Sequence, residues 1–300
     1  MVNMIIKAGN FEIYPLLDGY FWLDGGMMFR QAKIAWENLY KPDEKNRIKL
    51  ASHCYLIKGK ALTLFDSGMG DPSDPVFAAI AGSSYKDFFG IDQTNGNLVT
   101  SLAKAGFSPP DIHFVSQSHL HLDHTGWHVW TDPQSGKIMP FFPKATYLID
   151  EKELAAGEKS HPLSLKSYRK VAFQTLFEVD PNFSLRYVWK SRWKHFEREP
   201  GFVFIRTGGH THGHWVALIE SGKAKIFLAG DLIPTHKHIV PVNVMSYDLW
   251  PTKVYSEKVK FLEQAAKENW LILFDHDPDY IGGYVTKDKK GHFEFSPAIF

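Results

Sequence analysis

Four residues that can bind a metal ion lie within six positions of one another: His119, His121, Asp123 and His124. The leucines between them give the alternation of a chain that leaves a buried strand. In an extended conformation His119, His121 and Asp123 point to one side, and a turn at Asp123 brings His124 to a neighbouring position. Imidazole nitrogen and carboxylate oxygen together suit zinc, with manganese or iron as alternatives. This spacing predicts a metal site rather than three unrelated core or surface histidines.

The segment His119–His124 resembles the His-x-His-x-Asp-His hallmark of the metallo-β-lactamase superfamily. Other stations of that family appear in order along the chain: Leu64-Phe65-Asp66-Ser67-Gly68, Thr207-Gly208-Gly209-His210-Thr211-His212-Gly213-His214, Phe227-Leu228-Ala229-Gly230-Asp231 and Phe274-Asp275-His276-Asp277. The resemblance covers most of the chain. It implies an α/β fold, an αββα sandwich of two mixed β-sheets flanked by helices.

The same resemblance implies a centre that holds two divalent metal ions, with zinc expected and manganese or iron as alternatives. The first ion would be held by His119, His121 and His210, and the second by Asp123, His124 and His276. Asp231 would bridge the two ions, and Asp66 would support the ligands from outside the centre. Two cations about 3.5–4 Å apart can share a hydroxide and polarise a substrate oxygen. Asp123 and Asp231 are therefore the expected catalytic residues.

The second histidine-rich turn departs from the family pattern, because His212 stands where proline is usual. His212 and His214 are therefore alternatives to His210 as ligands, although the position in the motif favours His210. Histidine at position 121 argues against the oxygen-reducing di-iron branch of the superfamily. The aspartate station at Asp231 argues against true β-lactamases.

Further segments resemble a lactonase-like group of the superfamily, which includes acyl-homoserine-lactone hydrolases and organophosphate-hydrolysing relatives. These segments are Leu23–Phe29, Gly230–Thr235 and Tyr247-Asp248-Leu249. An apolar wall of the substrate pocket is expected from Phe21, Met27, Met28, Phe29 and Tyr247. Such a wall suits an acyl chain or an aromatic leaving group, and core packing is the alternative for each residue. Pro234 stands where lactonases often place a tyrosine, so Tyr247 and Tyr20 are the candidate substitutes.

These resemblances favour the hydrolysis of a lactone or a carboxylic ester. In this hypothesis a metal-bridging hydroxide attacks the carbonyl carbon, and Asp123 relays a proton to the leaving alkoxide. Hydrolysis of a phosphotriester or phosphodiester is one alternative. An iron-dependent oxygenase and a metal-binding module without turnover are the others.

Short apolar strands must position these residues. Strands are predicted over 61–65 and 112–117, leading to Asp66 and to the histidine cluster, and over 202–207 before the second turn. A hairpin over 215–221 and 224–229 leads to Asp231, and a strand over 270–274 leads to His276. A further strand is predicted over 11–17, and the pattern of residues 252–269 is typical of an amphipathic helix.

The 300 residues are predicted to form a single domain, 1–300, in which the irregular segment 127–201 is an insertion that shapes the pocket. The formal net charge is +1, so the chain lacks the excess of lysine and arginine that is typical of nucleic-acid-binding proteins. No run approaches the about 18 apolar residues of a membrane span, and the only cysteine, Cys54, cannot form an intrachain disulfide. We therefore expect a cytoplasmic protein that acts on a small molecule. The aromatic content of 15% is compatible with a homodimer.

Overall fold

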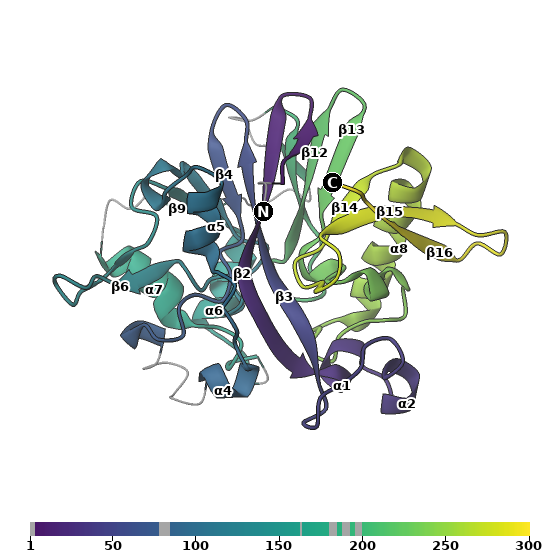
Figure 1. The fold of residues 1–300 in the computed structure, drawn as a ribbon, viewed down its shortest axis with the longest axis horizontal. Helices are drawn as coiled ribbons and strands as arrows, with labels where there is room; N and C mark the ends of the chain where they lie inside the picture. The colour runs from purple at the N-terminus through teal and green to yellow at the C-terminus, as the bar shows by residue number, and fades with distance from the viewer. Residues whose placement is uncertain (1–3, 78–84, 163, 180–184, 188–192, 196–199) are drawn as a thin grey trace. The chain divides into compact units, whose positions relative to one another are not determined.

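Two seven-stranded mixed β-sheets dominate the computed structural model, which describes residues 4–77, 85–162, 164–179, 185–187, 193–195 and 200–300 (Figure 1). The chain divides into two compact units. Unit 1 comprises Met1–Ile5, Glu12–Tyr20 and Ser52–Lys190, and unit 2 comprises Ile6–Phe11, Phe21–Ala51 and Ser191–Phe300. The expected mixed α/β architecture with two mixed sheets is confirmed.

The first sheet has the strand order β1-β2-β3-β4-β5-β8-β9. Its strands are β1 (Ile6–Ala8), β2 (Phe11–Asp24), β3 (Arg47–Lys58), β4 (Leu62–Phe65), β5 (Phe114–Ser116), β8 (Thr146–Ile149) and β9 (Leu185–Tyr187). Strand β5 pairs in parallel with β4 on one side and with β8 on the other. All three of its residues are buried, as is usual for a central parallel strand. The carboxyl ends of β4 and β5 therefore lie side by side, and the chain leaves them at Asp66 and Gln117.

The helices of unit 1 whose bounds lie within the described residues are α4 (Tyr85–Phe89), α5 (Leu98–Lys104), α6 (Glu151–Glu158) and α7 (Lys170–Val179), with a short 3₁₀ turn, η1 (Pro109–Asp111). Strands β6 (Val129–Thr131) and β7 (Ile138–Pro140) form a separate two-stranded sheet. Helix α5 begins with a capping box, in which Asn97 and Thr100 each accept the backbone N–H of the other. Leu102 of α5 and Leu176 of α7 pack with Val115 of β5 in one apolar core. These helices thus fix the strand that leads to the histidine cluster.

The second sheet lies in unit 2 and has the order β10-β11-β12-β13-β14-β15-β16. Its strands are β10 (Trp193–His195), β11 (Phe202–Arg206), β12 (Trp215–Ser221), β13 (Ala224–Leu228), β14 (Leu271–Leu273), β15 (Gly282–Lys287) and β16 (Phe293–Pro297). Only the pairing of β13 with β14 is parallel among the described strands of this sheet. The carboxyl ends of β13 and β14 are therefore neighbours, and they lead to Asp231 and His276.

Helix α8 (Pro251–Glu268) is the longest described helix of unit 2 and matches the helix predicted over 252–269. Pro251 occupies the first turn, where its missing N–H has no partner to lose, and Asn269 ends the helix in a left-handed conformation with φ 55°. Phe261 and Leu262 on its apolar face are buried in the core. The helix lies against β15 (Figure 1). Unit 2 also contains α1 (Gly25–Phe29), α2 (Lys33–Trp36), η2 (Gly230–Leu232) and η3 (His236–Ile239).

Strand β2 is longer than the strand predicted over 11–17, because it continues to Asp24. The predicted strand ended at Leu17, before Asp18-Gly19, a pair that is typical of turns. In the structure the Asp18 carboxylate accepts hydrogen bonds from the backbone N–H groups of Met69 and Leu98, each at 2.7 Å. Gly19 adopts a φ of 120°, which only glycine tolerates readily. Hydrogen bonds from the backbone of residues distant in sequence therefore keep Asp18 and Gly19 within a strand.

The segment 127–201 contributes β6, β7, β8, β9, α6 and α7 to unit 1 and β10 to unit 2, and parts of it lie outside the described residues. Its predicted role as a pocket-shaping insertion in a single domain, 1–300, stays a prediction.

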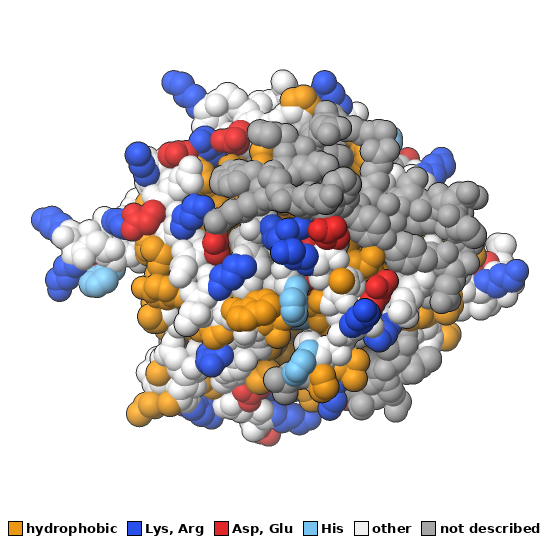
Figure 2. All heavy atoms as spheres, turned by 180° about the vertical axis from the view of Figure 1, so that it is seen from behind, with side chains coloured by type: hydrophobic (Ala, Val, Ile, Leu, Met, Phe, Trp, Pro, Cys, Tyr) orange, Lys and Arg blue, Asp and Glu red, His pale blue; other side chains and the backbone are white. Residues whose placement is uncertain are grey.

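Charges of both signs are mixed on the molecular face that Figure 2 shows. Lysine and arginine side chains of the described residues alternate there with acidic and apolar ones, in keeping with the formal net charge of +1. Within the described ranges, every helix is too short or too polar to cross a membrane.

Candidate metal centre

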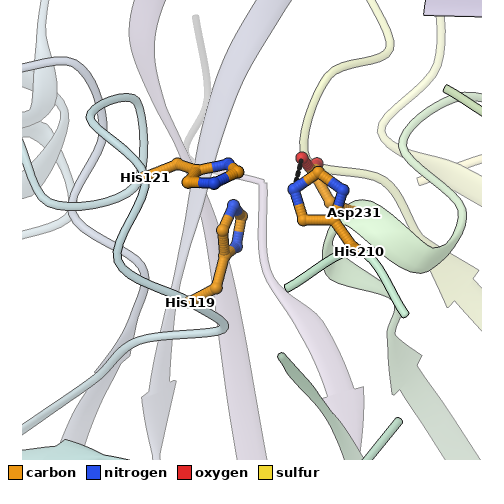
Figure 3. A group of neighbouring side chains, drawn as sticks. All are labelled: His119, His121, His210 and Asp231. Atoms are coloured by element: carbon orange, nitrogen blue, oxygen red, sulfur yellow. Dashed lines mark ion pairs between the residues drawn. The ribbon is translucent and has the colours of Figure 1, made fainter. Parts of the chain in front are cut away.

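Unit 1 gathers His119, His121, Asp123 and His124 directly after β5. The ring centroid of His119 lies 4.4 Å from that of His121 and 4.1 Å from that of His124 (His119 and His121 are drawn in Figure 3). The Nε2 atom of His124 is 3.9 Å from the Asp123 carboxylate. The three imidazoles are buried, whereas 20% of the Asp123 side chain is exposed. The four predicted ligands of unit 1 thus occupy one small volume that solvent reaches through Asp123.

Asp66 supports this cluster from the end of the neighbouring strand β4. Its carboxylate accepts hydrogen bonds from Ser118 N at 2.6 Å and from His124 Nδ1 at 2.9 Å. An imidazole that donates from Nδ1 presents an unprotonated Nε2, the form that binds metal. Asp66 adopts a φ of 60°, a left-handed conformation that is uncommon outside glycine. These are the contacts that the predicted supporting role of Asp66 requires.

Glu153 and Tyr168, which belong to none of the recognised motifs, also support the histidine cluster. Glu153 of α6 accepts hydrogen bonds from Leu120 N and from the Tyr168 hydroxyl, both at 3.0 Å. His121 in turn pairs with Tyr168 as an isolated β-bridge. Neither support was predicted from the sequence, because Glu153 lies 33 residues from its partner Leu120 and no local pattern links the two.

The buried carboxylate of Asp18 braces the loops on either side of the cluster. It accepts hydrogen bonds from Met69 N at 2.7 Å, Gly70 N at 3.2 Å and Trp127 Nε1 at 2.7 Å. Burial raises the pKa of Asp18 to about 7, and these donors oppose the rise. One side chain thereby ties the loop that follows Asp66 to the residues that follow the histidine motif.

Unit 2 gathers His210, Asp231 and His276. His210 lies in the turn between β11 and β12, while Asp231 and His276 follow β13 and β14. His210 Nε2 is 3.1 Å from one oxygen of the Asp231 carboxylate, and His276 Nε2 is 3.1 Å from the other (Figure 3 shows the first pair). Burial disfavours the ionised carboxylate, but the two histidines keep the pKa of Asp231 well below its usual range. Each oxygen of Asp231 thus faces a different imidazole, as a bridging carboxylate requires.

Both histidines of this group are anchored through Nδ1. His210 Nδ1 is 2.8 Å from the Asp248 carboxylate, and His276 Nδ1 is 3.0 Å from the carbonyl oxygen of Ala51. Together with His124 in unit 1, three predicted ligands therefore have Nδ1 on an oxygen acceptor and present Nε2. This donor set, nitrogen in the metal-binding tautomer beside carboxylate oxygen, fits zinc.

The two alternative histidines of the second turn lie differently from His210. His212 is exposed, and its ring contacts Trp250 at 4.7 Å between centroids. His214 is buried, with Nδ1 at 2.7 Å from a threonine hydroxyl and Nε2 accepting the backbone N–H of Asp231 at 3.1 Å. His214 therefore positions the backbone of Asp231, whereas His210 faces its carboxylate. This geometry favours His210 as the ligand.

Two of the five predicted pocket residues, Phe21 and Tyr247, border the histidines of unit 2, and a third, Met28, contacts Tyr247. The Phe21 ring meets the His276 ring edge-on at 5.4 Å, and the Tyr247 ring lies 5.7 Å from that of His210. The Tyr247 hydroxyl donates to the Sδ atom of Met28 at 2.8 Å. The remaining two lie differently: Met27 is 42% exposed, and Phe29 is buried and stacks on Trp36 and His238. The surroundings of Phe29 therefore favour a role in core packing, the alternative given above for each of these residues.

Pro234, which stands where a tyrosine was expected, supports a predicted ligand. Its carbonyl oxygen accepts the backbone N–H of His276 at 3.0 Å. Of the two candidate substitutes, Tyr20 lies in unit 1, where its backbone pairs with Asp92. Tyr247 is the one that borders a predicted ligand within its own unit.

Residues 47–137, which include the histidine motif, match the Metallo-beta-lactamase superfamily. An N-acyl homoserine lactonase from a Bacillus species is 24% identical over 182 residues, which are 60% of this chain and 62% of that protein. The match therefore spans less than two thirds of the relative's length.

Two solved structures are similar over nearly the whole chain. A probable metal-dependent hydrolase from Staphylococcus aureus has a TM-score of 0.82 at 24% identity, covering 98% of this chain and 99% of that one. AidC, a dizinc quorum-quenching lactonase solved with a homoserine product, has a TM-score of 0.75 at 28% identity, covering 99% and 98%. Part of this chain therefore matches the metallo-β-lactamase superfamily, and the chain as a whole has the fold of these two solved structures, as its motifs predicted.

Proposed function

We propose that this protein is a dinuclear metal-dependent hydrolase that opens a lactone or cleaves a carboxylic ester. The observation that carries the proposal is the Asp231 carboxylate, each oxygen of which faces the Nε2 atom of a different buried histidine. The lactonases among the similar proteins support the choice of lactone or ester.

In this proposal the cluster of unit 1 and the cluster of unit 2 belong to one centre. His119, His121 and His210 would hold one ion, Asp123, His124 and His276 would hold the other, and Asp231 would be a ligand shared by both. When bound, the two ions supply a water molecule of lowered pKa and a Lewis acid for the substrate oxygen. Zinc is the proposed metal because the donor set is rich in imidazole nitrogen.

Asp123 is the proposed proton donor to the leaving alkoxide. It is the carboxylate of the unit 1 cluster, and its partly exposed side chain can exchange protons with solvent. Tyr247 is proposed to orient the carbonyl oxygen of the substrate, because its hydroxyl now donates to Met28 Sδ, a weak acceptor that a carbonyl oxygen can replace. The apolar side chains of Phe21 and Met28 exclude water from this side of unit 2.

A matched pair of variants tests the proposal. His210→Ala removes a buried predicted ligand, whereas His212→Ala removes an exposed histidine two residues away. On a panel of acyl-homoserine lactones, simple lactones and carboxylic esters, kcat/KM is expected to fall by about 100-fold or more in the first variant, because transition-state stabilisation is lost. The second variant should behave like the wild type, and chelation followed by zinc should abolish and restore activity.

The double variant His119→Ala, Asp231→Ala should be inactive, since it removes a ligand from each unit. Full lactone and ester hydrolysis by this double variant would contradict the proposal. Turnover of a phosphotriester panel with no lactone or ester turnover would favour the phosphoesterase alternative instead. Metal analysis of the purified protein distinguishes zinc from manganese and iron.

A further inference from the structure

The guanidinium of Arg169 is buried in unit 1 and meets no hydrogen-bond acceptor within the described ranges. Its side chain is 2% exposed, and none of its three nitrogens has a hydrogen-bond partner among the described residues. A guanidinium carries five N–H donors, and a buried ion without a partner is strongly unfavourable. Burial lowers the pKa of Arg169, and the negative charge of Asp123 opposes this effect. Something other than the described side chains must satisfy these donors.

Two aromatic rings make cation–π contacts with the Arg169 guanidinium, but these contacts provide no acceptor for its N–H groups. The Cζ atom of Arg169 lies 4.0 Å from the centroid of the Tyr85 ring and 4.6 Å from that of Phe77. A ring attracts a cation through its face, so the donors in the guanidinium plane remain available. The buried hydroxyl of Tyr85 also has no hydrogen-bond partner among the described residues. Two unsatisfied polar groups are therefore carried by side chains in direct contact.

These two groups lie beside the histidine motif. His121 pairs with Tyr168, the residue before Arg169, and Leu122 N donates at 2.9 Å to the carbonyl oxygen two residues before Arg169. The Asp123 carboxylate acts on Arg169 through space without a hydrogen bond to it. The backbone pairing thus carries Arg169 to the side of the unit 1 cluster on which Asp123 lies.

We propose that Arg169 and Tyr85 form a binding site for a carboxylate group. A carboxylate offers two coplanar oxygens that a guanidinium binds through two parallel hydrogen bonds, and its further lone pairs can accept the Tyr85 hydroxyl. The inference rests on the proposed function, because hydrolysis of a lactone or ester generates a carboxylate. The ligand is either this product group or a second carboxylate carried by the substrate.

Four variants test the site in the full-length protein. Arg169→Met removes the charge but keeps an unbranched side chain, Arg169→Lys keeps the charge without the fork, and Tyr85→Phe removes only the hydroxyl. The control is Lys166→Gln, which removes a positive charge from an exposed position of the same segment. The probe is sodium hexanoate, whose binding is measured by titration calorimetry in zinc-loaded and in chelator-treated protein.

Arg169→Met is expected to weaken hexanoate binding by about tenfold or more in both metal states, because a charge-assisted hydrogen bond is lost. Tyr85→Phe and Arg169→Lys should weaken it by smaller factors, and Lys166→Gln should leave it unchanged. The melting temperature of Arg169→Met without hexanoate should equal or exceed that of the wild type, since an unpaired buried charge is replaced by an apolar chain.

Hexanoate affinity of Arg169→Met equal to that of Lys166→Gln would overturn the inference. A lower melting temperature together with unchanged hexanoate binding would also overturn it, by showing that Arg169 only packs against the rings. If Arg169→Met does not fold, Tyr85→Phe and Arg169→Lys decide by the same measurement.

A second arm separates the two sources of the carboxylate. A monoester of a dicarboxylic acid is compared with its uncharged diester as substrates. Loss of the preference for the monoester in Arg169→Met identifies a carboxylate on the substrate, whereas a change confined to inhibition by hexanoate identifies the product. Hexanoate binding requires no turnover, so a protein that binds hexanoate through Arg169 but hydrolyses no lactone or ester contradicts only the proposed function.

Discussion

Replacing Asp66 with asparagine changes the tautomer of a predicted metal ligand and little else. One oxygen of Asp66 accepts Ser118 N at 2.6 Å, and the other accepts His124 Nδ1 at 2.9 Å. An asparagine has one acceptor oxygen and one amide donor. Because the backbone N–H of Ser118 can only donate, the oxygen stays with it and the amide turns its donor towards His124. His124 must then accept at Nδ1 and carry its proton on Nε2, the atom proposed to bind metal.

The expected effect is a large loss of zinc affinity with a small loss of stability. Removing a partner of this kind weakens metal binding by about 10–100-fold, and the upper end applies because Asp66→Asn also stabilises the wrong tautomer. The φ of 60° at this position is tolerated by asparagine as well as by aspartate, so the backbone gains no strain. The folding penalty is then that of one altered buried hydrogen bond, about 1 kcal/mol.

Zinc affinity is measured by competition with a chromophoric chelator. The control is Ser67→Ala, because the Ser67 hydroxyl donates to the carbonyl oxygen of His124 at 3.0 Å without touching its ring. We expect Asp66→Asn to bind zinc about 100-fold more weakly than the wild type and Ser67→Ala to bind it nearly as well. Equal zinc affinities in the two variants, with both folded, would refute the argument from the tautomer.

Three further results are expected. Asp248→Asn should weaken zinc binding about tenfold or more through His210 Nδ1, and unchanged affinity in the same competition assay would show the 2.8 Å contact to be incidental. Burial disfavours protonated His210, but Asp231 and Asp248 raise the pKa of His210 to about 10 in the metal-free protein. Zinc binding near pH 8 should therefore release a proton, detected by calorimetry in buffers of different ionisation enthalpy, and heats independent of the buffer would argue otherwise. Burial lowers the pKa of Lys258 from 10.5 to about 7, so between these pH values the unfolded chain binds more protons and the free energy of unfolding rises with pH, by at most about 4 kcal/mol. Lys258→Met should remove this rise in denaturant titrations at about pH 7 and pH 10, and an unchanged slope would show that Lys258 is not its source.

The positions of the predicted ligands and of the supporting Asp66 followed from the ends of apolar runs. Asp66 and His119 come after β4 and β5, while Asp231 and His276 come after β13 and β14, and each pair of strands is parallel. In a parallel pair the carboxyl ends meet at one edge, so residues that end such runs are brought together. This is why the pattern of the sequence was informative about the clusters within each unit.

The supporting residues could not be predicted in the same way. Asp248 is 38 residues from His210, and Asp18 is 109 residues from Trp127. A carboxylate next to an apolar run is equally compatible with a turn, and the strand predicted over 11–17 stopped before Asp18. Only tertiary pairing supplies the donors that make such a carboxylate stable when it is buried.

The residues of the unit 1 cluster are close together in sequence, whereas those of the unit 2 cluster are far apart. This difference affects how well the unfolded chain can bind zinc. His119, His121 and His124 lie within six positions, so an unfolded chain can already chelate zinc there. Asp231 and His276 are brought together only when β13 and β14 pair, although these strands are far apart along the chain. Zinc that binds the unfolded chain offsets part of the stabilisation it gives to the folded one. The gain in stability on adding zinc is therefore smaller than the zinc affinity of the folded protein alone implies.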